Sequence, residues 1–137
     1  MFSYNHKVQY YETDKMGIVH HSNYIRWFEE ARTAALVVMG IAYDYLEIIV
    51  IIAPIVEANA KYKTTTKFGE VVTVVSKIVK YNGVRLVFEY SVSDASDNTL
   101  KCFGSTTNCF INNNGKPRNL IKDFPQVSEV FERYCNL

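Results

Sequence analysis

The sequence predicts a single α+β domain in which one long helix lies across an antiparallel sheet of about five strands. Three observations predict this class. The length of 137 residues suits one domain over 1–137. Only one segment carries a sustained helical periodicity of apolar residues. Ten Tyr and eight Phe favour strands elsewhere. One helix covers only one face of such a sheet, so we expect a homo-oligomer to bury more surface.

The long helix is expected over residues 22–39, with Ser22 or Asn23 as its N-cap and Gly40 as its stop. Arg32 falls near the edge of the apolar face, where its long side chain is expected to reach water. The apolar residues that share one face at helical spacing are Tyr24, Ile25, Phe28, Ala31, Ala35, Leu36 and Met39.

The remaining elements are strands and short helices separated by turn residues. A first strand is expected at 4–12, and a loop at 13–21. Asn82-Gly83 is a favourable hairpin pair between two of the later strands. The four later strands, in antiparallel succession, are expected at 55–63, 71–81, 84–92 and 99–112, with short helices at 42–47 and near 123–135.

The composition excludes several classes of function. A net charge of +1 without a basic run argues against nucleic acid as a partner. Three cysteines without a C-x-x-C pair indicate reduced thiols, and neither disulfides nor a metal site. The N-terminus has no signal-peptide pattern, and the apolar run at 48–53 is too short to span a membrane. We therefore expect a cytoplasmic protein without a membrane partner.

The stretch "DKMGIVHHSNYIRWF" (14–28) places an acid, a glycine and two histidines just before the long helix. A helix N-terminus offers unpaired N–H groups and a positive dipole end, which can hold an oxyanion. Asp14 lies seven residues before His21, and a turn at Gly17 can fold its carboxylate back toward that helix end. A carboxylate beside oxyanion donors is sufficient to hydrolyse an acyl bond. Without further evidence, the spacing alone favours a loop acid near the helix dipole over a catalytic carboxylate.

The longer stretch "YYETDKMGIVHHSNYIRWFEEART" (10–33) resembles the signature of the hotdog-fold acyl-CoA thioesterases. The resemblance is to the 4-hydroxybenzoyl-CoA thioesterase family and its Tol-Pal-associated branch. It extends over nearly the whole chain and implies a hotdog fold, with the sheet wrapped around the central helix. His20 departs from it, because the Tol-Pal-associated branch usually has an aromatic residue there. The matching residues are Tyr10, Tyr11, Asp14, Gly17, Val19, His21, Asn23 and Tyr24.

The resemblance also implies residue roles. Asp14 matches the catalytic carboxylate, acting as general base or nucleophile, and the backbone N–H of His21 matches the group that polarises the thioester carbonyl. The side chains of His21 and Tyr10 are implicated in one branch, and Gly17 forms the turn. Glu30 is a reserve candidate for the acid, because some hotdog relatives carry it in the helix. No metal or cofactor is implied, since coenzyme A is part of the substrate.

The implied substrate and assembly complete the expectations. Arg85, Lys116 and Arg118 are candidates for binding the phosphates of CoA. The implied assembly is a homodimer or a dimer of dimers, hence a homotetramer. Three alternatives stay open: a non-catalytic acyl-CoA-binding protein, an acyl-carrier-protein thioesterase, and a dehydratase or hydratase of acyl thioesters.

Overall fold

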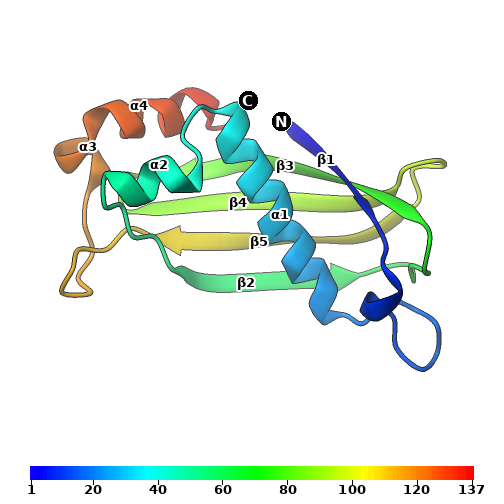
Figure 1. Ribbon diagram of the computed structural model, residues 1–137. Coiled ribbons are helices and arrows are strands. Elements are labelled where there is room, and N and C mark those ends of the chain that lie inside the picture. Colours follow the sequence, from blue (N-terminus) through cyan, green and yellow to red (C-terminus); the bar gives the residue numbers. More distant parts are fainter.

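The computed structural model describes residues 1–137 and shows a five-stranded antiparallel sheet with one long helix across one face (Figure 1). The predicted fold class is confirmed. The elements in chain order are β1 (Phe2–Lys7), a 3-10 turn η1 (Tyr10–Glu12), α1 (Ser22–Val38), α2 (Tyr43–Ile48), β2 (Ile55–Tyr62), β3 (Val71–Tyr81), β4 (Arg85–Asp94), β5 (Leu100–Cys109), α3 (Leu120–Asp123) and α4 (Pro125–Tyr134).

The sheet order is β1-β3-β4-β5-β2, so consecutive pairing holds only from β3 to β5. β2 precedes β3 in the chain but pairs with β5 at the opposite edge from β1. At that edge, seven of the eight β2 residues are exposed. None of the helices is long and apolar enough to cross a membrane.

The core lies between α1 and the sheet. The Phe28 ring stacks on Tyr90 of β4 with ring centroids 4.4 Å apart, and this pairing fixes the middle of the helix on the sheet. Of the predicted apolar face, Ile25 is only half-buried but still packs against the core, whereas Trp27, which the prediction omitted, is fully buried. Trp27 is covered because β1 lies along that side of the helix, with the His6 ring 4.9 Å from the indole.

Arg32 does not reach water as expected, because it is only 6% exposed. Three hydroxyl groups replace the solvent. Its Nε–H donates to Tyr43 Oη at 3.2 Å. Nη1 donates to Tyr90 Oη at 3.2 Å and to Thr106 Oγ1 at 3.4 Å.

The first and last predicted strands are shorter than expected. β1 ends at Lys7, because the chain turns into η1 where the aromatic pattern suggested continued extension. β5 ends at Cys109 rather than at residue 112. Both differences lie at the ends of elements, where a local pattern constrains the structure least.

Candidate active site

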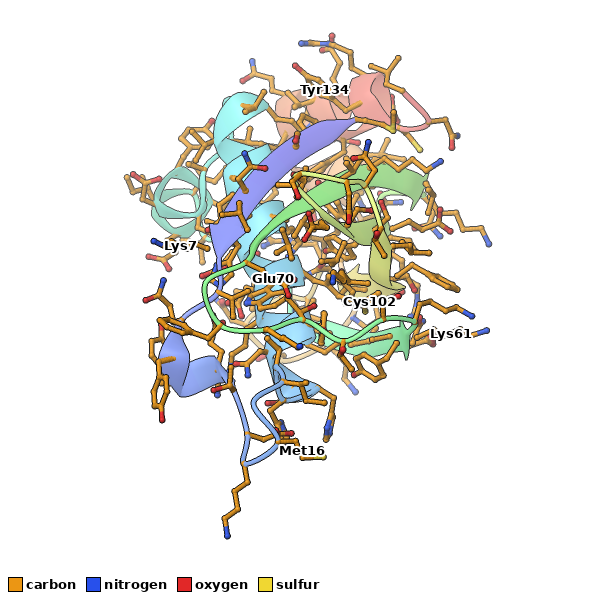
Figure 2. All side chains as sticks on the ribbon, turned by 90° about the vertical axis from the view of Figure 1, so that its right-hand side faces the viewer. Lys7, Met16, Lys61, Glu70, Cys102 and Tyr134 are labelled. Atoms are coloured by element: carbon orange, nitrogen blue, oxygen red, sulfur yellow. The ribbon has the colours of Figure 1, made fainter.

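The segment before α1 is a tight hairpin. Thr13 and Val19 form an antiparallel bridge, and the Asp14 N–H donates to Ile18 O at 2.8 Å. Gly17 closes the turn at φ +79°, a conformation that side-chain-bearing residues rarely adopt. Figure 2 shows this hairpin projecting from the body of the protein, with Met16 at its tip. The loop and the turn glycine expected from the sequence are therefore present.

Asp14 and His21 lie on the same cavity, which has a volume of about 340 Å³. The cavity is also lined by Tyr24 of α1, Tyr62 of β2 and Thr64. Its volume is at the lower end of the range for small-molecule sites. The structure thus brings the predicted acid and the predicted helix end together.

The Asp14 side chain is half-buried and held by its own turn. Its Oδ1 accepts a hydrogen bond from the Met16 N–H at 2.8 Å, the only hydrogen bond that the carboxylate makes within the chain. Oδ2 is therefore without a protein partner. A carboxylate with one oxygen fixed and one available is suited to accept a proton or to attack a carbonyl carbon.

The predicted capping by Ser22 or Asn23 is wrong. The N-cap residue is His21, and no side chain caps the helix. The Ser22 N–H donates to His20 Nδ1 at 3.3 Å, and the Asn23 and Tyr24 N–H groups donate to the His20 and His21 carbonyls at 3.0 and 3.3 Å. These three amides are satisfied by the two histidines because the chain enters the helix through a tight turn. The His21 N–H donates to no group of the chain, so it is the available donor at this positive helix end.

The rings of His20 and His21 pack against each other and both line the cavity. Their ring centroids are 4.2 Å apart, and His20 Nδ1 lies 2.9 Å from Ser22 Oγ. Tyr62 donates to the His21 carbonyl at 3.3 Å, which connects β2 to the helix start. Burial raises the pKa of Tyr62, so its phenol is neutral at neutral pH. His20 lines the cavity as well as His21.

Two other predicted catalytic residues lie elsewhere. The Tyr10 side chain is 76% exposed and packs edge-to-face on Phe68, away from the Asp14 cavity. Glu30 faces β1, with Oε2 3.1 Å from His6 Nδ1. Within one chain, neither side chain lines the cavity.

The three predicted phosphate-binding cations are also remote. Arg85 begins β4, and Lys116 and Arg118 follow β5, so all three lie at the opposite end of the sheet from the hairpin (Figure 1). Arg118 is further engaged by Asp123, with Nε 3.0 Å from the carboxylate. Within one chain these residues therefore cannot contact a group bound beside Asp14.

Sequence reasoning missed Glu12, which is 4% exposed directly behind the hairpin. Burial raises the pKa of its carboxyl, but hydrogen bonds from the Gln9 N–H, His6 and Trp27 outweigh burial and lower the pKa below its ordinary value. A sequence signal for a partner of this kind was available. Asn23 and Trp27, which both donate to Glu12, are four residues apart and therefore share one face of the helix. That face is the one turned toward the hairpin.

Cys102 is a buried cysteine of β5 that does not line the cavity. Burial raises the pKa of its thiol to about 12. The thiol is therefore protonated at neutral pH and is a poor nucleophile.

Comparison with known proteins identifies the family. Residues 8–132 match the family described as the thioesterase-like superfamily. YneP of Bacillus subtilis strain 168, provisionally named an acyl-CoA thioesterase, is 34% identical over 128 residues, covering 93% of this chain and 92% of that protein. A protein of Aquifex aeolicus strain VF5, provisionally named an esterase, is 32% identical over 126 residues, covering 92% of this chain and 96% of that protein.

The solved structures give the same result. The DHNA-CoA thioesterase from Staphylococcus aureus superposes with a TM-score of 0.91 at 32% identity, covering 96% of this chain and 89% of that chain. The fold and these matches define a hotdog-fold thioester hydrolase. The chain belongs to the thioesterase-like superfamily.

Proposed function

We propose that this protein is an acyl-CoA thioesterase, which hydrolyses a CoA thioester to the free acid and CoA. The observation that carries the proposal is the presence of the Asp14 carboxylate and the unpaired His21 N–H on one cavity. The names of YneP and of the S. aureus enzyme support a CoA ester as the substrate. Within the superfamily, the motif at 10–33 favours the 4-hydroxybenzoyl-CoA thioesterase family and its Tol-Pal-associated branch.

In the proposed reaction, Asp14 either takes a proton from an attacking water or attacks the thioester carbonyl itself to form an anhydride that water then opens. In both routes the His21 N–H donates to the oxyanion of the tetrahedral intermediate. The C–S bond then breaks and CoA leaves as a thiolate, which needs little acid assistance. The His21 ring is a further candidate for this chemistry, because it lines the same cavity.

The proposed enzyme is a cytoplasmic homo-oligomer, either a dimer or a dimer of dimers. The exposed β2 edge, with Ile55 and Val56 41% and 50% exposed, supports an assembly in which this edge is covered. Tyr10 participates in catalysis only if it reaches the cavity of a neighbouring subunit. The same condition applies to Arg85, Lys116 and Arg118 as ligands of the CoA phosphates, since the start of β4 and the segment after β5 lie at the opposite end of the sheet from the hairpin.

The test is thiol release from a panel of acyl-CoA esters, followed by Asp14→Asn on the best substrate. We expect Asp14→Asn to lower kcat by about 100-fold or more, in line with loss of a general base or nucleophile. Asp44→Asn, at an exposed acid of α2, is the matched control and should retain activity. Full kcat in Asp14→Asn would refute the mechanism.

The alternatives have distinct outcomes in the same assay. Saturable binding of CoA esters without thiol release would indicate a non-catalytic binding protein. Faster turnover of a carrier-protein ester than of the matched CoA ester would indicate an acyl-carrier-protein thioesterase. Conversion of an enoyl or hydroxyacyl ester without thiol release would indicate a dehydratase or hydratase.

A further inference from the structure

Behind the Asp14 hairpin, the carboxylate of Glu12 joins three parts of the fold. Oε1 accepts a hydrogen bond from the Gln9 N–H at 2.8 Å and lies 2.8 Å from Nε2 of His6 on β1. Oε2 accepts from Nε1–H of Trp27 on α1 at 2.7 Å. Because Glu12 is 4% exposed, these groups take the place of solvent around a buried charge.

The backbone of the same residue closes the base of the hairpin. The Glu12 carbonyl accepts hydrogen bonds from the His20 N–H at 2.9 Å and from Nδ2 of Asn23 at 2.9 Å. Glu12 and His20 are thus paired on either side of residues 13–19. Asp14 comes two residues after Glu12, so the position of Asp14 relative to the helix end depends on where Glu12 is held.

His6 strengthens the attachment of Glu12 to β1. Its Nδ1 lies 3.1 Å from Oε2 of Glu30, while Nε2 faces Glu12. A neutral imidazole has one N–H, so only the protonated ring donates to both carboxylates. The ring also packs on Trp27, with centroids 4.9 Å apart. The Glu12 carboxylate therefore connects β1, through Oε1 and His6, with α1, through Oε2 and Trp27.

We propose that Glu12 is a positioning residue, which fixes the hairpin bearing Asp14 against the start of α1, with Trp27 as its partner on the helix. The inference rests on the proposed function, in which Asp14 and the His21 N–H act on one thioester. Glu12 does not line the cavity, and both of its oxygens are engaged, so it acts only through the groups it places. Displacement of a reacting group by about 1 Å can lower the rate by about 100-fold.

The first test is Glu12→Gln. Glutamine keeps the shape of the side chain, but its NH₂ must face one of the donors that now point at the carboxylate. We expect kcat to fall by about 10-fold to 100-fold while KM changes by less than about 2-fold, because the cavity itself is retained. Trp27→Phe removes one donor and should lower kcat by a smaller factor. In the double variant the two losses should not multiply, since both variants break the same contact.

Tyr81→Phe is the matched control, because it removes one part-buried hydrogen bond, to Ser128 at 2.7 Å, between β3 and α4. It should lower stability without changing kcat. Assays are run well below the unfolding temperature of each variant. If Glu12→Gln lowers the unfolding temperature but leaves kcat unchanged, the positioning role is wrong. If that variant does not fold, Trp27→Phe decides by the same criterion.

Amide hydrogen exchange separates this inference from the proposed function. In Glu12→Gln, faster exchange is expected at the Asp14, Val19 and His20 amides, while amides in the middle of β3 and β4 keep their protection. This result together with full activity in Asp14→Asn would leave the anchor standing and overturn the proposed mechanism. Unchanged exchange over residues 13–20 would overturn the anchor, whatever the activity.

Discussion

Two charges are buried beside α1, and they are compensated in different ways. Glu12, 4% exposed, is bound by donors from β1, from Gln9 just before η1, and from α1, and one of them is an ionisable imidazole. Arg32, 6% exposed, is bound only by the hydroxyls of Tyr43, Tyr90 and Thr106 and has no carboxylate within ion-pair distance. The anion connects backbone segments that carry the site, whereas the cation connects side chains only. Removing the Glu12 charge should therefore lower the free energy of unfolding more than removing the Arg32 charge.

The largest effect is expected from Glu12→Ala. Its removal leaves the buried Nε1–H of Trp27 and the part-buried Gln9 N–H without their acceptor, and His6 facing one carboxylate instead of two. We expect the free energy of unfolding to fall by about 3–5 kcal/mol, as for other broken buried pairs. Urea denaturation measures this. A loss below about 1 kcal/mol would show that water replaces the carboxylate and that the charge is not an anchor.

The next largest effect is the difference in the free energy of unfolding between Arg32→Ala and Arg32→Met. The alanine variant loses both the hydrogen bonds and the packing of the methylene stem, so we expect it to cost about 2–3 kcal/mol. Methionine fills the space without a charge to desolvate, and Tyr90 and Thr106 stay bonded to each other at 2.7 Å. Its free energy of unfolding should lie within about 1 kcal/mol of the parent. If both variants cost the same, the charge rather than the stem stabilises this region, and the contrast with Glu12 fails.

The third prediction concerns pH. The pKa of Glu12 is lowered in the folded protein, so the associated stabilisation is complete above the ordinary glutamate pKa and is lost as pH falls through the lowered value. We expect the parent and Glu12→Gln to converge in stability below about pH 4, by about 1.4 kcal/mol for each unit that the pKa has moved. The difference between the parent and Arg32→Met should stay constant, because a guanidinium does not titrate in this range. Urea denaturation between pH 7 and pH 3 measures both.

The contrast between these two residues also shows what the sequence can reveal. Local periodicity predicted β3 over 71–81 and the long helix to within one residue, because each pattern is set by neighbours along the chain. Asp14 and His21 were predicted together from the turn at Gly17 and from the family resemblance, and the structure places both on one cavity. The burial of Arg32 was not predictable, since it depends on hydroxyls 11, 58 and 74 residues away.

The same argument applies to Glu12 and to the edge strand. Glu12 lies at the end of an aromatic run that suggested extension, and its partner Trp27 is 15 residues away across the hairpin. β2 was predicted to within one residue, but its pairing with β5 is a long-range contact that no local signal encodes. The prediction of the N-cap was wrong for a related reason. His20 and His21 accept hydrogen bonds from the first amides of the helix through a turn that is specific to this fold.

The smallest predicted effect is that of Tyr43→Phe. Tyr43 lies on α2 and is half-buried, and its hydroxyl accepts from the Arg32 Nε–H at 3.2 Å. Water can take the place of this hydroxyl more easily than it can replace those of Tyr90 and Thr106 on the sheet, so we expect a loss of about 0.5–1 kcal/mol and an unchanged kcat. Tyr45→Phe, on the same helix and 43% exposed, is the control and should change neither quantity. A loss as large as that of Arg32→Ala would mean that α2 holds the guanidinium, and that the cation also fixes a separate element of the fold, as Glu12 does.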